Sequence, residues 1–258
     1  MGRLTRFSAN LGFLWNDLPL AAAIRAARAA GFDAVECHWP YDTPAREVVQ
    51  ALEETGMEML GLNTRRGNAD NGEFGLAAIP GREAEARADI SEGLAYAAAT
   101  RTRNLHVMAG ITTHDGARAC FEENLLFACQ AARQVGVTIL IEPINGFDVP
   151  GYFLTQTAQA AELIARLDQP NLRLMFDCYH VQRMEGEILP ILQQVLPIVG
   201  HVQFAAVPDR GPPDHGEVDY RTIFSALAEL GYKEPLGAEY RCTAPTEATL
   251  GWMRDLRD

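Results

Sequence analysis

The stretch Ala117–Glu142, ARACFEENLLFACQAARQVGVTILIE, contains one complete unit of the pattern that decides the fold. Its first part, Ala117–Val135, is alanine-rich and amphipathic, which predicts a helix with one buried face. Gly136 stands where a glycine commonly ends a helix. The run Val137–Glu142 is apolar, rich in β-branched residues and closed by a carboxylate, so it predicts a buried strand with a polar end.

The same unit repeats along the whole chain. Further amphipathic stretches are Leu18–Ala30, Arg82–Ala99 and Thr157–Leu167. Eight strand–helix units without a break in composition predict an α/β fold, a single (β/α)8 TIM barrel formed by residues 1–258. A doubly wound open sheet is the less favoured alternative. The predicted strands are Arg6–Asn10, Ala34–His38, Met57–Asn63, Asn104–Met108, Val137–Glu142, Leu172–Asp177, His201–Phe204 and Gly237–Tyr240.

Four of these strands carry a polar oxygen-bearing side chain in or at the end of an apolar run. Successive members are far enough apart in the sequence for one helix and its loops to lie between them. Parallel strands of a barrel end at the same face, so the four side chains are expected to converge there. Three carboxylates brought together in a dry place need a cation to neutralise them. The sequence therefore predicts a metal enzyme, with candidate residues Glu142, Asp177, Gln203 and Glu239.

Charge and cysteine usage exclude several classes of partner. The net charge of -12 argues against nucleic acid, whose binding depends on clustered lysine and arginine. Five cysteines form no CxxC motif, and their odd number favours reduced thiols in a cytoplasmic protein. No apolar run approaches the length of a membrane span, and the N-terminus has no apolar stretch with a cleavage pattern, so no membrane partner is expected.

The chain has a single lysine, and its position excludes the kinds of catalysis that depend on a lysine in the active site. Lys233 lies in the turn before the last predicted strand, at the bottom of the expected barrel and away from the catalytic face. Schiff-base catalysis, attachment of pyridoxal phosphate and a P-loop lysine are therefore excluded. The chain also lacks a G-x-G-x-x-G after a strand and a G-x-S-x-G elbow.

Several strings resemble hydroxypyruvate isomerases, which belong to the xylose-isomerase-like barrel superfamily together with 2-oxo-tetronate isomerases and ketose 3-epimerases. The similarity runs over nearly the whole chain, and the strings that contain IEPIN and YH-QRMEGE are specific to the isomerase branch. The five strings are FSANL (Phe7–Leu11), IEPIN-FD-PG (Ile141–Gly151), D-YH-QRMEGE (Asp177–Glu187), GHVQ-A (Gly200–Ala205) and IPGRE (Ile79–Glu83).

The resemblance implies a divalent metal held by Glu142, Asp177, Gln203 and Glu239, and it implies that Glu142 and Glu239 exchange protons with substrate carbons. Moving a carbonyl to the neighbouring carbon requires a proton to leave one carbon and another to arrive next door. A metal polarises the carbonyl and stabilises the enediolate, while two carboxylates serve as base and acid. The amide of Gln203 makes the ligand set all-oxygen, which favours Mg²⁺ or Mn²⁺ over zinc.

The superfamily pattern also implies substrate contacts at Asp148, His180 and Arg210. A carboxylate substrate needs a cationic partner, which Arg210 or the neighbouring pair Arg65 and Arg66 could supply as a bidentate fork. His180 could instead satisfy the turn after the sixth strand. The remaining histidines are expected to be structural or exposed, with His38 an option for the pocket wall. Trp39 and Tyr41 either wall the site or pack under a loop.

The loop after Gln203 departs from the pattern of similar isomerases. Ala206 stands where they usually have an aspartate, and the sequence continues as PDRGPPDHGE. Arg210, Gly216 and Glu217 still fit the pattern. The departure leaves the proposed metal ligands intact and leaves the exact substrate open.

The sequence therefore favours a metal-dependent isomerase that interconverts hydroxypyruvate and tartronate semialdehyde, or a close hydroxy-oxo acid, through an enediolate. The alternatives are a 2-oxo-tetronate isomerase and a ketose 3-epimerase, with the same glutamates acting on a sugar. A phosphodiesterase on abasic DNA would need more histidine ligands and a basic groove. A binding protein for sugar acids would bind metal without turnover. Physiological metal, pathway and oligomeric state stay open, with a homo-oligomer as one option.

Overall fold

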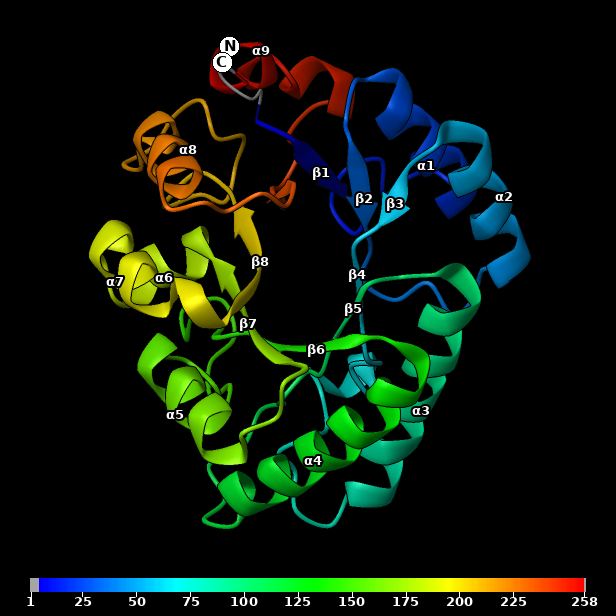
Figure 1. Cartoon of the computed structure of the whole chain (residues 1–258), viewed down its shortest axis with the longest axis vertical. Coiled ribbons are helices and arrows are strands. Elements are labelled where there is room, and N and C mark those ends of the chain that lie inside the picture. Colours follow the sequence, from blue (N-terminus) through cyan, green and yellow to red (C-terminus); the bar gives the residue numbers. More distant parts are fainter. Residues whose placement is uncertain (1–4, 258) are drawn as a thin grey trace.

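The repeated strand and helix units close into a ring in the computed structural model, which describes residues 5–257 (Figure 1). Within that part, nine strands pair in parallel in the order β3-β2-β1-β9-β8-β7-β6-β5-β4. Only Leu60 separates β3 from β4, and these two pair with β2 and β5 respectively, so together they fill the third position of an eight-membered barrel. The strands are β1 Phe7–Asn10, β2 Ala34–Glu36, β3 Glu58–Met59, β4 Gly61–Asn63, β5 Asn104–His106, β6 Thr138–Ile141, β7 Leu172–Asp177, β8 Val199–Phe204 and β9 Leu236–Ala238.

The helices surround the ring of strands, as Figure 1 shows. Gly56 and Gly136 end α2 and α4 in the left-handed conformation, with φ of 65° and 70°, which favours glycine because it has no side chain. The α-helices are α1 Leu20–Ala29, α2 Ala45–Thr55, α3 Glu83–Thr100, α4 Ala117–Val135, α5 Thr157–Leu167, α6 Cys178–Met184, α7 Ile188–Val195, α8 Tyr220–Glu229 and α9 Trp252–Leu256, and the 3-10 helices are η1 Ala69–Asn71, η2 Leu196–Ile198 and η3 Thr246–Thr249.

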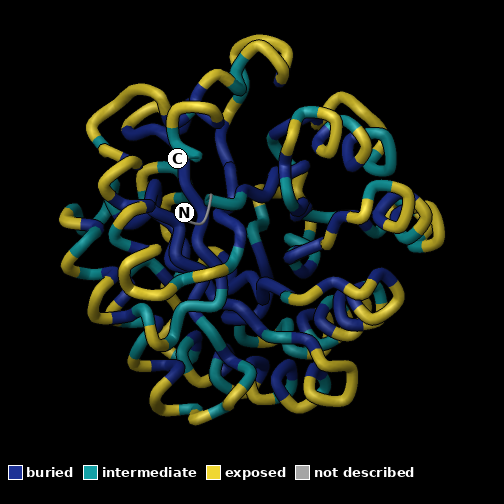
Figure 2. Tube along the Cα trace, turned by 45° about the horizontal axis from the view of Figure 1, so that its top comes forward, coloured by how far each residue is buried: buried dark blue, intermediate teal, exposed yellow. Residues whose placement is uncertain are grey.

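The core follows the strands. Figure 2 shows buried residues along the centre of the molecule and exposed ones on the outer turns of the helices and loops. Aromatic side chains fill the seam where β1 meets β9. Phe7 packs edge-on against Trp252 with ring centroids 5.0 Å apart, and Phe204 packs against Phe224 at the same distance. Such pairs contribute about 0.5–1.5 kcal/mol each beyond their buried area. This cluster joins the first strand to the last helices and holds the barrel closed.

The structure confirms the predicted barrel. The predicted bounds of α4, α5 and β7 match those observed, whereas β6 and β9 end one residue before Glu142 and Glu239. The backbone leaves the strand ladder at these residues, so their side chains stand at the C-terminal face of the barrel. No described helix is long and apolar enough to cross a membrane. Residues 1–4 and 258 lie outside the described part, so one domain over residues 1–258 stays a prediction.

Candidate active site

The four polar residues predicted at strand ends come together at the C-terminal face of the barrel. Glu142 follows β6, Asp177 ends β7, Gln203 lies in β8 and Glu239 follows β9. The pairing of β7 with β8 sets Asp177 directly beside Gln203. All four residues are buried, with 1–6% of their surface exposed. The convergence expected from the strand ends is therefore observed.

The carboxylates of this cluster are crowded in a dry place. Burial raises the pKa of Glu142 well above its ordinary value of 4.5, and the negative charges of Glu239 and Asp177 raise it further. Burial likewise raises the pKa of Asp177. The positive charge of Arg210 lowers this pKa in part, and the negative charge of Glu239 raises it further. Carboxyl groups this close do not all ionise near neutral pH without an added positive charge.

Arg210 supplies part of that charge from inside the site. Its Nη2 donates to Oε1 of Glu239 over 2.5 Å and lies 3.5 Å from Oδ2 of Asp177. The residue has a φ of 58°, and its guanidinium lies over the rings of Phe13 and Tyr179, 4.8 and 5.0 Å from their centroids. The guanidinium predicted to contact substrate is thus buried among the proposed metal ligands.

Asn145 determines how the ring of His180 is protonated. The Oδ1 atom of Asn145 accepts from the backbone N–H groups of Phe147 and Asp148, so its Nδ2 is the end that faces His180. That Nδ2 lies 2.7 Å from Nδ1 of His180, and the backbone N–H of Asn145 donates to the same atom over 3.2 Å. Because Nδ1 accepts both bonds, the neutral ring carries its proton on Nε2.

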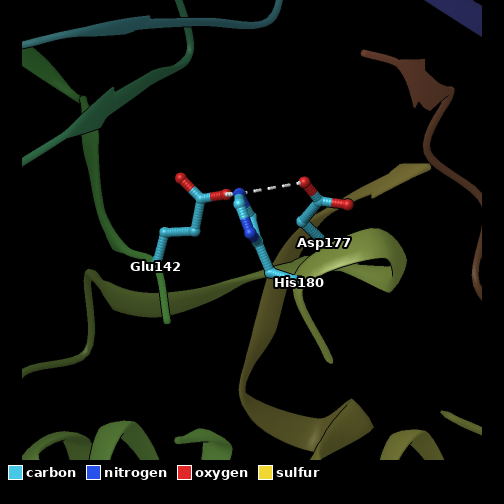
Figure 3. A group of neighbouring side chains, drawn as sticks. All are labelled: Glu142, Asp177 and His180. Atoms are coloured by element: carbon cyan, nitrogen blue, oxygen red, sulfur yellow. Dashed lines mark ion pairs between the residues drawn. The ribbon is translucent and has the colours of Figure 1, made fainter. Parts of the chain in front are cut away.

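The Nε2 atom of His180 lies between the carboxylates of Glu142 and Asp177, as Figure 3 shows. It lies 3.6 Å from Oδ2 of Asp177 and 3.8 Å from Oε1 of Glu142. The three side chains are close enough to form a metal-binding group. A protonated nitrogen has no lone pair to give, however, and burial lowers the pKa of His180 far enough to keep the ring neutral. The geometry therefore favours a hydrogen-bond donor over a metal ligand.

The oxygens facing this space fit a divalent cation. Among the described residues, Oε1 of Glu142, Oδ2 of Asp177 and Oε1 of Gln203 are buried and have no hydrogen-bond partner. A buried oxygen left unpaired costs free energy, and an Mg²⁺ or Mn²⁺ ion would satisfy all three. Glu239 borders the same cavity. Three of the four expected ligands therefore present an unpartnered oxygen among the described residues, and the metal site stays a prediction.

The cavity beside these groups has an empty volume of about 450 Å³, open solvent at its mouth included. Trp39 lines it, so this ring walls the site, while the hydroxyl of Tyr41 donates to the backbone oxygen of Asn63. Arg65 forms two hydrogen bonds with Glu92 of α3. The wall also includes Phe13, Phe74, Met108, Ile144, Val149 and Met175.

The other predicted substrate contacts lie at the edge of the site. Oδ2 of Asp148 accepts from the hydroxyl of Tyr179 over 2.9 Å and lies 3.9 Å from Nη1 of Arg210. Arg66 lies over the ring of Trp39, 4.7 Å from its centroid. Asp148 is therefore next to the guanidinium, whereas Arg66 contacts the wall.

Two buried residues near the ligands were not singled out from the sequence. His106 ends β5 and lines the cavity, with Nδ1 3.5 Å from Oε2 of Glu142, and neither ring nitrogen has a hydrogen-bond partner among the described residues. Burial lowers its pKa to about 3, so the ring is neutral. Glu36 ends β2 and accepts hydrogen bonds from His201 and Gln203. A polar residue at a strand end was the available signal for both.

Known proteins resemble the chain over nearly its whole length. Residues 24–256 match the family model described as xylose isomerase-like TIM barrel. The sequence is 41% identical over 255 residues to the 2-oxo-tetronate isomerase of Cupriavidus necator, covering 97% of this chain and 98% of that protein. It is 36% identical over 258 residues to the hydroxypyruvate isomerase of Escherichia coli K12, covering 98% and 100%.

Solved structures agree with the fold. A Brucella melitensis protein described as AP endonuclease, family 2, superposes with a TM-score of 0.94 at 37% identity, covering 98% of this chain and 100% of that one. The D-psicose 3-epimerase of Clostridium cellulolyticum has a TM-score of 0.81 at 16% identity, with 98% of this chain and 100% of that one covered, and supports the fold alone.

Proposed function

Because the chain belongs to the xylose isomerase-like TIM barrel family and is an isomerase, we propose that it interconverts hydroxypyruvate and tartronate semialdehyde. Mg²⁺ or Mn²⁺ would be held by Glu142, Asp177, Gln203 and Glu239. The observation that carries the proposal is the set of three buried, unpartnered oxygens on neighbouring strand ends, with one guanidinium beside them.

Two of the chain's own groups account for the proton transfers at carbon, while the hydroxyl proton passes from the C3 oxygen to the C2 oxygen. Glu142 and Glu239 come from well-separated strands, so one can remove a proton from C3 of hydroxypyruvate while the other returns a proton to C2. Burial and the negative charges of Glu239 and Asp177 raise the pKa of Glu142 above its ordinary value, which makes this carboxyl group a better proton acceptor. A bound divalent cation would polarise the substrate carbonyl and offset the negative charge of the enediolate.

His180 and Arg210 would bind the substrate. The Nε2–H of His180 faces the cavity, and in the described part of the chain no acceptor is closer than 3.6 Å, so it is available to a substrate oxygen. Arg210 presents a planar guanidinium in the same space, suited to two parallel hydrogen bonds with a carboxylate. Asp148 would hold that guanidinium from the other side, and Arg66 is the second candidate for the carboxylate.

A second substrate has specific support. The 2-oxo-tetronate isomerase of Cupriavidus necator is 41% identical to this chain, and its substrate by name also carries a carboxylate beside an oxo group. Ala206 stands close to Arg210, where similar isomerases usually have an aspartate. This difference affects whether a three-carbon or a four-carbon acid is the better substrate. A ketose 3-epimerase is less favoured because a neutral ketose offers no carboxylate to Arg210.

Turnover of matched substrate pairs tests the proposal. Dihydroxyacetone differs from hydroxypyruvate only by a hydroxymethyl group in place of the carboxylate, and erythrulose differs from 2-oxo-tetronate in the same way. With metal removed and then restored as Mg²⁺ or Mn²⁺, we expect hydroxypyruvate to have the highest kcat/KM and each acid to exceed its neutral partner. Preference for 2-oxo-tetronate selects the second substrate, and preference for the neutral ketoses overturns the proposal.

Other expectations stay predictions alongside this one. They are a single domain over residues 1–258, a cytoplasmic location, a homo-oligomer as one option for the assembly, and a small hydroxy-oxo acid or sugar as partner without nucleic acid or membrane.

A further inference from the structure

A buried carboxylate lies inside the barrel beside the proposed metal ligands. Glu36 is 3% exposed and ends β2, on the far side of β1 and β9 from Gln203 in the order of the sheet. Its Oε1 accepts from the hydroxyl of Ser8 over 2.7 Å. Its Oε2 is 2.9 Å from Nε2 of His201 and accepts from Nε2 of Gln203, also over 2.9 Å. Two strands, β1 and β8, therefore contribute three donors to one carboxylate.

The bond to Gln203 determines which end of its amide faces the site. The Nε2 atom donates to Oε2 of Glu36 and to Oε2 of Glu239, the latter over 2.5 Å. The Oε1 atom is left buried without a hydrogen-bond partner in the described part of the chain. A flipped amide would turn its oxygen toward two carboxylates and its NH₂ toward the site. Only the oxygen of an amide can bind a metal ion, so the observed orientation is the productive one.

We propose that Glu36 is a positioning residue that holds the amide of Gln203 with its oxygen toward the divalent cation, while Ser8 and His201 hold Glu36. This inference rests on the proposed function, in which Gln203 binds the cation. Glu239 cannot hold the amide of Gln203 in this orientation alone, because a carboxylate oxygen that binds a cation is a weaker acceptor for the N–H of the amide. Glu36 does not border the cavity, so its bond to Gln203 is independent of what the cavity holds.

The packing around β9 leaves the amide little freedom. Gly237 lies beside the cluster, where a Cβ atom would come 2.3 Å from Oε1 of Glu36 and 2.9 Å from both Cγ of Gln203 and Nε2 of His201. These contacts are closer than real Cβ atoms allow. The three side chains therefore pack directly on the backbone of β9, and this packing resists rotation of the glutamine.

Burying the carboxylate of Glu36 with the imidazole of His201 costs free energy, which points to a role for the pair other than stabilising the fold. Nε2 of His201 lies 2.9 Å from Oε2 of Glu36, and both side chains are buried. Glu36 and His201 thus form a buried ion pair. Well-packed apolar residues in place of such a pair are often as stable or more stable, so stability alone does not explain it.

Manganese titration of a small set of variants tests the inference. In Glu36→Gln, the new amide can keep an oxygen toward Gln203 and turn its NH₂ toward the hydroxyl of Ser8, which can accept. In the double variant Glu36→Leu/His201→Leu, the ion pair is replaced by apolar side chains and the acceptor is lost. Asn124→Leu is the matched control, because it removes a buried hydrogen-bonded side chain on α4 that lies away from Gln203.

Each protein is titrated with Mn²⁺ by calorimetry without substrate, after circular dichroism has verified the fold. We expect the double variant to bind Mn²⁺ about 10–100-fold more weakly, the usual effect of losing a residue that orients a metal ligand. Glu36→Gln and Asn124→Leu should stay within about threefold of the unmodified protein, well short of that loss. Saturating Mn²⁺ should restore most of the kcat of the double variant, which a distorted catalytic group would not allow.

Normal Mn²⁺ affinity in the folded double variant overturns the inference. If the double variant does not fold, Glu36→Leu is measured at about pH 8, where an imidazole without a carboxylate partner is neutral, with the same expectation and the same refutation. Failure of the proposed function gives a different result, because the unmodified, folded protein would then bind no Mn²⁺.

Discussion

Two arrangements of the metal site differ in the role of His180. In one, four oxygen atoms bind the metal and His180 does not; in the other, a glutamate, an aspartate and His180 bind it. Because Asn145 gives two N–H groups to Nδ1, we expect Nε2–H of His180 to donate to substrate and not to bind metal. Replacement by leucine removes the donor. Replacement by glutamine keeps an N–H at a similar reach.

The structure sets the size of the effect. Nε2 has no acceptor nearer than 3.6 Å among residues 5–257, so its removal breaks no bond to the proposed metal ligands. If the donor meets the oxygen on which charge develops, its loss costs about 2.7–4 kcal/mol, or 10²–10³-fold in kcat. His180→Leu also leaves the two N–H groups of Asn145 unpaired, at about 1–3 kcal/mol of folding stability.

Calorimetric titration with Mn²⁺ and steady-state turnover of hydroxypyruvate on the same preparations provide the test. For His180→Leu we expect nearly unchanged Mn²⁺ affinity with the large loss in kcat, and for His180→Gln a smaller loss. A His180→Leu protein that stays folded but binds Mn²⁺ more than about 10–100-fold more weakly would refute the proton assignment and make His180 a ligand.

Four further predictions concern the other groups. Glu142→Gln and Glu239→Gln should each lower kcat by at least ~100-fold and suppress exchange of the substrate C–H with solvent; near-normal exchange would remove that residue from the mechanism. Arg210→Lys should raise the KM for hydroxypyruvate and leave dihydroxyacetone little changed, because lysine keeps the charge but not the fork; equal losses on both substrates would make the arginine structural. Gly237→Ala places a Cβ 2.3 Å from a carboxylate oxygen, so overpacking should cost about 1–3 kcal/mol in chemical denaturation; unchanged stability would contradict the packing. Burial raises the pKa of Asp177 to about 7, so in the metal-free protein its contribution to stability is present at low pH and is lost as pH rises through about 7. Mn²⁺ must then displace a proton, so its affinity should fall from about pH 8 to about pH 6 with proton release in calorimetry, and a constant Kd would count against this.

The positions of the proposed ligands could be predicted because they depend on local patterns. A short apolar run followed by a carboxylate identifies both the strand and its polar end, as for Glu142 and Asp177. Parallel strands then bring such ends to one face whatever the details of packing. The helix α4 was equally predictable, because its amphipathic pattern and Gly136 mark both its character and its end.

Other features depend on partners that are distant in the sequence. Nothing near Glu36 shows that His201 and Ser8 will meet it inside the barrel. The break of the third strand at Leu60 likewise reflects how the ring closes between β2 and β5. Arg210 was expected in the loop beyond Gln203, yet its left-handed backbone places the guanidinium among the carboxylates. Contacts between distant parts of the chain, which local sequence does not encode, decided the first two cases, and the backbone conformation of Arg210 decided the third.

Proton NMR of hydroxypyruvate in heavy water, with the metal-depleted enzyme and then with added Mg²⁺, tests the central claim most directly. Proton transfer through an enediolate predicts that tartronate semialdehyde forms only with the metal and carries deuterium at C2. It also predicts that recovered hydroxypyruvate gains deuterium at C3. Product formed without the metal, or product whose C2 hydrogen comes entirely from C3 without exchange, would contradict the account.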